Sequence, residues 1–291
     1  MTMHTDRRIG SLAVNLLVAT VCLSLAACRL STASAEGTLS ASASGAKSVV
    51  VQNRNGSVEI VKDPAATDLQ ISAKVRCAAE SKEAAEARLK DTKLVAERDA
   101  EGCVRVQVVF PPREPAAGTV MLGGSGEGAS LVIRAANLEG IQVDTGNGSI
   151  TCGGFNGLAK LGTSNGSIRI DGHGGPVHLD TSNGAIEATR VGTPLIAETS
   201  NGRVEVSLDE SATGDVKIDT SNGRVELQLS AAWQGTVQAD TSNGSIDAST
   251  PSAKVVRMDR GEATVTIGDG TKAKATIDTS NGRVTIRAAT K

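Results

Sequence analysis

The sequence predicts an all-β protein, folded as a parallel β-helix or β-solenoid with coils of roughly 18–21 residues and one short helix in an N-terminal insert. Three observations predict this fold. A four-residue motif recurs at nearly constant spacing along the second half of the chain. Apolar and polar residues alternate on both sides of the motif, which is typical of strands with one buried face. Aromatic residues make up only 1% of the 291 residues, and a stack of narrow coils needs few large rings.

The recurring motif is Thr-Ser-Asn-Gly, and a looser copy, Asp144-Thr145-Gly146-Asn147-Gly148, precedes the others. From the first asparagine, successive steps are 18, 18, 18, 21 and 21 residues. The last step is 38 residues, or two steps of 19 if Asp259-Arg260-Gly261-Glu262 is a worn copy. A fixed short period indicates one structural unit stacked on itself. The asparagines are Asn147, Asn165, Asn183, Asn201, Asn222, Asn243 and Asn281.

Each repeat is predicted to contain two short strands that meet at the Asn-Gly corner. In one repeat, Val216 and Ile218 share a face before the corner, and Val225 and Leu227 share a face after it. Glycine adopts positive φ at little cost and asparagine tolerates the left-handed region, so both residues suit a tight corner.

An antiparallel hairpin across each Asn-Gly turn is the alternative. It would place Asp219 opposite Glu226, and other repeats would repeat that like-charge pairing at a cost of up to about 1 kcal/mol each. In a parallel stack, equivalent residues lie about 4.8 Å apart and asparagine side chains can form a hydrogen-bonded ladder. We therefore favour the solenoid, with the seven asparagines as a structural corner ladder.

Parallel stacking also brings carboxylates into one column. We expect the amides of the corner, and three arginines alongside, to offset their repulsion. Calcium binding, or lyase-like catalysis on sugars by converging acids and bases, is the alternative role for this column. The carboxylates are Asp180, Glu198, Asp219, Asp240 and Asp278, and the arginines are Arg203, Arg224 and Arg283.

Ahead of the repeats, residues 49–61 are predicted to form two strands around an early Asn-Gly corner. Alternating apolar residues predict further strands at 69–75 and 104–108. Between these two strands, Ser81 is a suitable N-cap for a helix that ends at about Lys90.

The helix belongs to a predicted insert at about residues 77–103, and a flexible Gly- and Pro-rich loop follows at about 111–129. Cys77 and Cys103 flank the helical segment and could form a disulfide in an exported protein.

Residues 1–27 are predicted to be a lipoprotein signal peptide. A basic pair and a mostly apolar run lead to Leu25-Ala26-Ala27-Cys28, which resembles the lipobox of bacterial lipoproteins. The resemblance implies diacylation of Cys28 and cleavage before it; a plain signal peptide or an uncleaved membrane helix is the alternative. Arg29, in place of an aspartate, favours the outer membrane, on its periplasmic or surface side. Residues 28–46 are then a lipidated cysteine with a Ser- and Ala-rich tether, and residues 47–291 are the folded domain.

The remaining composition offers little chemistry. Formal net charge is −2, and removal of residues 1–27, with one Asp and two Arg, gives −2 − (+1) = −3, which provides no basic surface for nucleic acid. His173, His178 and Asp180 are the one cluster of metal-ligand types. A metal needs three or four converging ligands, so we favour a polar turn, with a zinc or copper site as the alternative. The sequence thus predicts no metal, no cofactor and no catalytic residues.

The chain resembles the putative-adhesin family of bacterial β-strand-repeat domains, a group of unknown function. The resemblance covers about residues 47–290 and includes the opening Val-x-Asn-x-Asn-Gly-x-Val-x-Ile, the strand–helix–strand insert and the Ser-Asn-Gly repeats. It implies a fold and no reaction. We expect a non-catalytic, lipid-anchored protein of the cell envelope that presents a rigid surface to a glycan or an envelope protein. The alternative is a carbohydrate-active, lyase-like β-helix that could depend on calcium.

Overall fold

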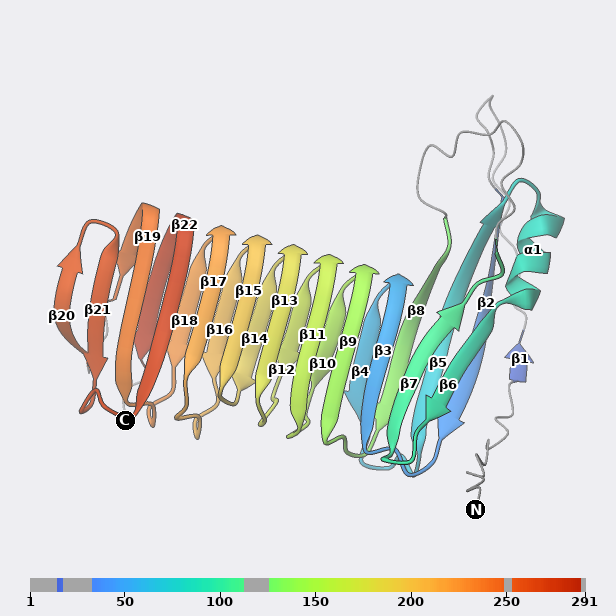
Figure 1. The fold of residues 1–291 in the computed structure, drawn as a ribbon, viewed down its shortest axis with the longest axis horizontal. Helices are drawn as coiled ribbons and strands as arrows, with labels where there is room; N and C mark the ends of the chain where they lie inside the picture. The colour runs from blue at the N-terminus through green and yellow to red at the C-terminus, as the bar shows by residue number, and fades with distance from the viewer. Residues whose placement is uncertain (1–14, 18–32, 113–125, 249–252, 289–291) are drawn as a thin grey trace, which may run out of the picture.

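The computed structural model describes residues 15–17, 33–112, 126–248 and 253–288. The predicted all-β class with one short helix is confirmed. Figure 1 shows a long row of strands, with the helix α1 at one end and a hairpin at the other. Cys28 and most of the predicted loop at 111–129 lie outside the described residues.

Most strands belong to two ladders of parallel strands, and each repeat contributes one strand to each ladder. Ladder A contains the strands before the Asn-Gly corner, which are β3 (Ser48–Asn55), β9 (Gly140–Asn147), β11 (Leu158–Asn165), β13 (Val177–Asn183), β15 (Leu195–Asn201) and β17 (Val216–Asn222). Ladder B contains the strands after it, which are β4 (Val58–Lys62), β10 (Ile150–Gly153), β12 (Ile168–Asp171), β14 (Ile186–Val191), β16 (Val204–Leu208) and β18 (Val225–Leu229).

The register of these ladders places like residues on like. Thr163 pairs with Thr181, and Asn165 pairs with Asn183 in the next repeat. In these repeats the two strands that flank an Asn-Gly corner lie in different ladders, so they do not form the alternative hairpin. Columns of identical residues follow directly from this pairing.

The order of the last strands in space differs from their order in the chain. β22 (Ala273–Ala288) lies between β17 and β18 on one side and β19 (Gly235–Asp247) on the other, and it runs through both ladders. Asn281 therefore stacks on Asn222, and Asn243 stacks on Asn281. The 38-residue step between the two motifs does not contain an intervening coil.

An antiparallel hairpin closes this end of ladder A. β21 (Glu262–Ile267) pairs with β19, and β20 (Ala253–Asp259) pairs with β21. The predicted worn copy at Asp259-Arg260-Gly261-Glu262 is wrong, because these residues form the turn of the hairpin. Gly261 has a φ of 86°, which suits such a turn.

The other end of the stack is built from longer antiparallel strands. β8 (Gly128–Ala135) lies beside β4 in ladder B, followed by β5 (Leu69–Ala79) and β2 (Ala33–Ala43). β1 (Asn15–Leu17) pairs with β2 but lies within the predicted signal peptide, so cleavage before Cys28 would remove it. In ladder A, β7 (Cys103–Val109) lies beside β3, and β6 (Lys93–Arg98) pairs with β7.

The tether predicted at residues 28–46 is wrong from Ala33 to Ala43. All eleven residues of β2 pair with β5. Leu39 and Ala41 are buried and alternate with exposed serines, so this Ser- and Ala-rich segment has the period of a strand. Its composition suggested a flexible linker because its buried side chains are mostly small.

Helix α1 (Lys82–Asp91) packs across this end of the molecule, against β2 and β5. Its N-cap is Ser81, as predicted, and the Ser81 Oγ accepts a hydrogen bond of 3.1 Å from the Ala84 amide. Leu89 is buried against Gly37 of β2, where a Cβ atom would lie 3.1 Å from the leucine side chain. The glycine therefore allows the helix to approach the strand.

The core lies between the two ladders and consists mainly of Val, Ile, Leu and Ala. Two of the three aromatic side chains are buried at turns between repeats, Phe155 at 0% exposure and Trp233 at 1%. Trp233 lies in the link from β18 to β19, and its indole N–H donates to the Gly214 carbonyl at 2.9 Å. This anchors the link where it passes the position occupied by β22.

The expected disulfide between Cys77 and Cys103 is not formed. Cys77 Sγ lies 3.5 Å from Thr92 Oγ1, directly before β6 and therefore beside the end of β7. Cys103 begins β7, so the two cysteines are separated by roughly 20 Å, the length of a seven-residue strand. A disulfide needs Cα atoms within about 7 Å. Cys152 is buried, and burial raises the pKa of its thiol to about 12, which makes it a poor nucleophile.

Candidate functional site

The asparagine side chains at the corner form a continuous ladder. In each repeat, Nδ2 donates to Oδ1 of the asparagine in the neighbouring repeat, at distances from 2.7 Å to 3.1 Å. All of these bonds point the same way, so the amide dipoles are aligned and reinforce one another. The order in space is Asn55, Asn147, Asn165, Asn183, Asn201, Asn222, Asn281 and Asn243.

Asn55 begins the ladder, and the predicted set did not include it. Its Nδ2 donates to the Glu127 carbonyl at 3.0 Å, so the series ends on the backbone there. The Asn55-Gly56 pair in the sequence was the signal that could have identified it.

The corner glycines are required chiefly by the close approach of stacked backbones. A Cβ atom on Gly202 would lie 1.9 Å from the Gly184 carbonyl oxygen, and one on Gly223 would lie 1.8 Å from the Gly202 oxygen. Of the corner glycines, only Gly56 and Gly148 have positive φ. The predicted reason for glycine, its freedom to adopt positive φ, is therefore wrong in most repeats.

The threonine that precedes each Ser-Asn-Gly faces inward and fixes the same backbone. Thr181 Oγ1, for example, donates to the Gly166 carbonyl of the neighbouring corner at 3.0 Å, and Thr163 does the same to Gly148 at 3.1 Å. In the first strand of ladder A, Asn53 takes this place and its Nδ2 donates to the Gly56 and Ala129 carbonyls, both at 2.9 Å. Asn, Gly and Thr thus act together as a structural corner.

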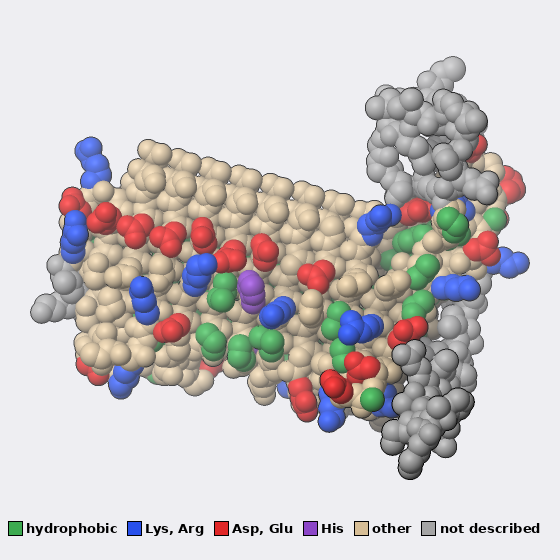
Figure 2. All heavy atoms as spheres, viewed as in Figure 1, with side chains coloured by type: hydrophobic (Ala, Val, Ile, Leu, Met, Phe, Trp, Pro, Cys, Tyr) green, Lys and Arg blue, Asp and Glu red, His purple; other side chains and the backbone are tan. Residues whose placement is uncertain are grey.

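The outer face of ladder A carries the predicted column of carboxylates, which we call the acidic column. Figure 2 shows a row of acidic side chains along this face, in the direction of stacking. β22 adds its carboxylate between those of β17 and β19, and β21 extends the column by one further acid. In spatial order the members are Asp180, Glu198, Asp219, Asp278, Asp240 and Glu262.

Few cations compensate this column. Lys217 Nζ lies 2.5 Å from Glu198, and His178 Nε2 lies 3.9 Å from the same carboxylate. The expectation that arginines offset the column is wrong for Arg203 and Arg224, because they directly precede β16 and β18 of ladder B. There they form ion pairs with the glutamates of that ladder, at 2.8 Å to Glu205 and 3.2 Å to Glu226.

Crowding in the column is greatest where β22 inserts. The pKa of the Asp278 carboxyl is raised by partial burial and by the neighbouring charges of Asp240 and Asp219. A hollow of about 470 Å³ lies over these carboxylates, beside Arg260 in the hairpin turn. Within the part of the chain that the structure describes, no group of three or more His, Cys, Asp or Glu side chains could hold a metal ion.

The weak metal-ligand candidates do not converge. His173 is fully buried, and its Nε2 lies 2.7 Å from the Gly157 carbonyl oxygen. His178 and Asp180 are on the outer side of β13, facing away from the core. His173 instead fills an interior column between Phe155 and Val191 of the neighbouring repeats.

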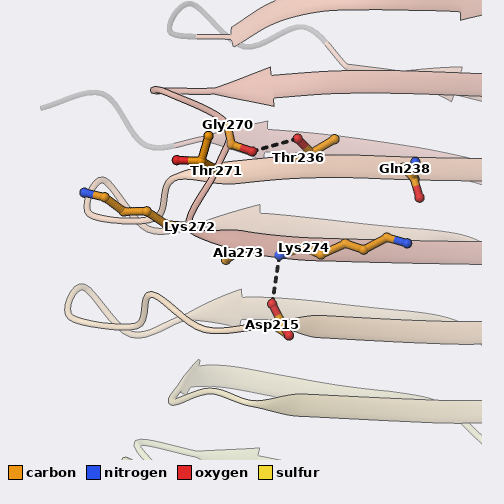
Figure 3. A pocket seen from close by; sticks show the side chains of 8 residues that line it. All are labelled: Asp215, Thr236, Gln238, Gly270, Thr271, Lys272, Ala273 and Lys274. Carbon is orange, nitrogen blue, oxygen red and sulfur yellow. Dashed lines mark hydrogen bonds between the residues drawn. The ribbon is translucent and has the colours of Figure 1, made fainter.

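A second hollow, of about 500 Å³, lies at the start of β19 and β22 and contains none of the predicted site residues. Figure 3 shows two hydrogen bonds among the residues that line it. Asp215 Oδ1 accepts from the Lys274 amide at 2.8 Å, and Thr236 Oγ1 donates to the Gly270 carbonyl at 3.0 Å. Lys272 extends away from the other side chains. These contacts position a turn.

A family model described as Toastrack DUF4097 matches residues 95–287, more than half of the chain. The chain belongs to the Toastrack family. The Toastrack match covers all of the Thr-Ser-Asn-Gly repeats but begins after α1.

Two solved structures are similar to this Toastrack protein at 11% identity. One is a putative cell adhesion protein from Clostridium sporogenes, with a TM-score of 0.37 over 89% of this chain and 100% of that chain. The other is a putative adhesin from Bacteroides fragilis, with a TM-score of 0.41 over 87% of this chain and 97% of that chain. A search of the curated proteins finds no match. Among the described residues, no helix has the length and apolar character needed to cross a membrane.

Proposed function

We propose that this Toastrack protein is a parallel β-solenoid, anchored to the cell envelope through lipid on Cys28, that binds an extended partner without catalysis. The observation that carries this proposal is the regularity of ladder A. Its repeats keep one register from β3 to β19, and its outer face carries one acid per strand from Asp180 to Asp240. Flat, repeated faces of this kind suit extended ligands.

The acidic column selects among partners by charge. Carboxylates about 4.8 Å apart create a negative potential along the face, and Lys217 is the one lysine or arginine that forms an ion pair with a column member from β13 to β19 in the described residues. A glycan or an envelope protein that carries positive charge at regular intervals would complement this face. The outer membrane is the proposed location, on either side.

The binding proposal is tested by removing charge from one ladder at a time. The triple variant Asp219→Asn, Asp278→Asn, Asp240→Asn should lose binding to isolated cell envelopes, and wild-type binding should weaken as salt rises. The matched control, Glu187→Gln, Glu205→Gln, Glu226→Gln, changes three stacked acids of ladder B and should bind as wild type does. Equal binding by both triple variants would contradict the proposal.

The anchor is tested separately. Cys28→Ala should leave the precursor unprocessed and unlipidated, whereas Cys22→Ala, within the same apolar run, should be processed normally. Normal lipidated product from the Cys28→Ala chain would refute the anchor.

The hollow over Asp219, Asp278 and Asp240 favours a second candidate, a carbohydrate-active site. It gathers acids at the point where the hairpin turn ends the parallel ladder, which is the arrangement a lyase-like enzyme would need. A purified protein that cleaves an envelope polysaccharide, and loses that activity in Asp278→Asn, would establish this function. A chelator that lowered the melting temperature would add a calcium requirement.

A further inference from the structure

We propose that the end of the molecule that carries α1 lies against a lipid bilayer and that the hairpin β20–β21 is held away from it. We call this surface the α1 end, defined by α1, the start of β2 at Ala33 and the end of β7 at Val109. The inference rests on the lipid anchor of the proposed function. It concerns a different surface from the acidic column and a different partner, the lipid headgroups.

The chain between the anchor and the fold is short. Cys28 and Ala33 are five residues apart in the sequence, and five extended residues span at most about 18 Å. Ala33 pairs with Ala79 of β5, which is two residues before the helix cap at Ser81. A lipid on Cys28 therefore keeps the α1 end within a short distance of the bilayer.

Hydrogen bonds join the parts of the α1 end into one surface. α1 leads directly into β6, whose first residue, Lys93, pairs with Val109 at the end of β7. Arg88 of α1 donates to the carbonyls of Pro111 and Pro112, at 2.7 Å and 3.1 Å. The helix, the end of β7 and the start of β2 consequently approach a bilayer together.

The chemistry of this surface is compatible with lipid headgroups. Val109 is 39% exposed and is one of three large apolar side chains in the described residues that are this exposed. The exposed charges of α1 and the start of β6 are balanced, so anionic lipids would not repel the α1 end. They would repel the acidic column. The exposed charged residues from 82 to 93 are Lys82, Lys90 and Lys93 on one side of the balance and Glu83, Glu86 and Asp91 on the other.

The opposite end is far away. Ladder A runs from β6 to β20 through twelve strands, and eleven spacings of about 4.8 Å give about 50 Å. A protein held by the α1 end would present the hollow beside Arg260 well above the headgroups.

Site-specific quenching tests this orientation. Full-length lipidated protein is reconstituted into vesicles of phosphatidylethanolamine and phosphatidylglycerol that contain a lipid with a spin label on its headgroup. A fluorophore is attached through Ala87→Cys on α1 or Met258→Cys on β20, both exposed positions, in a Cys103→Ser background. The label on α1 should lose most of its fluorescence, and the label on β20 should keep it.

The outcomes separate the two proposals. A wild-type chain that does not float with vesicles refutes the anchor, and the orientation with it. A chain that floats but shows equal quenching at both positions, or stronger quenching at Met258→Cys, refutes the orientation alone.

A longer linker provides the second variant. Inserting roughly 20 Gly and Ser residues after Leu30 adds a span of about 25 Å. Quenching of the Ala87→Cys label should then fall, although the protein still floats. Unchanged quenching in that variant would show that the short chain between Cys28 and Ala33 does not hold the α1 end near the bilayer, and would overturn the proposed orientation.

Discussion

At the scale of single residues, this protein is governed by how closely neighbouring repeats approach each other. Corner glycines lie so near the carbonyl of the next corner that no side chain fits between them, and inward threonines bind the same carbonyls. Glycine is therefore required at the corner because no side chain fits there, and threonine is favoured beside it because its hydroxyl donates a hydrogen bond.

Gly202→Ala should destabilise the fold strongly. Its Cβ would lie 1.9 Å from the Gly184 oxygen, and relieving such overpacking costs about 1–3 kcal/mol or more. The matched control is Gly162→Ala on the outer face, where the nearest atom is a mobile carboxylate oxygen of Asp144 at 3.0 Å. Urea denaturation should show a clear loss for the first variant and a change within about 0.5 kcal/mol for the second.

His173 should make stability depend on pH. Burial lowers the pKa of this imidazole in the folded state, and the Gly157 carbonyl only partly opposes the shift. Below pH about 6.5 the unfolded chain takes up a proton that the folded chain does not, so stability should fall as pH falls, by at most about 1.4 kcal/mol per pH unit.

The variant His173→Val, which copies Val191 of the next repeat, should flatten this dependence in urea titrations between pH 5 and pH 7. The control His178→Gln leaves the buried His173 ring in place, so the stability of this variant should depend on pH as that of the wild type does. If the stability of wild type and of His173→Val changed equally with pH, His173 would not be the source of the pH dependence.

At the scale of elements, the columns that join neighbouring repeats oppose one another. The asparagine ladder links the strands favourably, whereas the acidic column on the same ladder repels. Because both columns use one residue per strand, their effects can be measured with single substitutions.

Asn222→Ala should cost about 1–2 kcal/mol. It removes two ladder bonds, of 3.0 Å to Asn201 and 2.9 Å to Asn281, each contributing about 1 kcal/mol. These side chains are exposed, so the cost is below that of a buried amide. Asn243→Ala, at the end of the ladder, breaks only the bond to Asn281 and should cost about half as much in thermal melts. Equal costs would contradict a stepwise ladder.

Asp278→Asn should stabilise the protein by a few tenths of a kcal/mol, since it removes one of three adjacent like charges. The raised pKa of Asp278 in the folded state means that its repulsion weakens as pH falls through that pKa, so the gain should shrink in acid. Asp144→Asn is the control, because Gly162 separates Asp144 from the rest of the column. A loss of stability in Asp278→Asn would contradict the repulsion and would show that the carboxylate makes a net favourable contact in the fold, with Lys217 and Lys274 as the neighbouring cations.

At the scale of the whole molecule, the repeats form a stack with two different ends. One end carries α1 and long antiparallel strands, and the other carries the hairpin β20–β21. Antiparallel strands at an end interrupt the like-on-like register, and at the hairpin end they do so over the first half of β19, Gly235–Asp240.

Removing residues 273–291 should detach this second end. β19 pairs with β22 and β21 among the described strands, so the segment from β19 to β20 loses its connection to both ladders without β22. We expect amide hydrogen exchange to become fast in residues 235–267 and to stay slow in β11 and β13. Continued protection of β19 would show that it can stack directly on β17.

Much of this architecture is readable from the sequence, because the repeats are strongly periodic. The corner asparagines, the inward positions of Val216 and Ile218 and the Ser81 cap all follow from local pattern. The position of β22 does not, since β17, β19 and β22 carry the same Asp-Thr-Ser-Asn-Gly phrase and are interchangeable by sequence.

The strand β2 was missed for a different reason. Its serines and alanines have the composition of a linker, and only packing against α1 and β5 makes their burial favourable. For the candidate site, the sequence predicted the acidic column, but it could not predict that insertion of β22 would bring Asp219, Asp278 and Asp240 together.

The position of β22 also has a consequence for biogenesis. As the chain emerges during synthesis or export, residues 235–267 are released before the strand that they dock on. These residues cannot pair with β22 until residues 273–288 have emerged and have paired with β17. An export intermediate that stalls before residues 273–288 emerge would therefore leave this segment open to proteases.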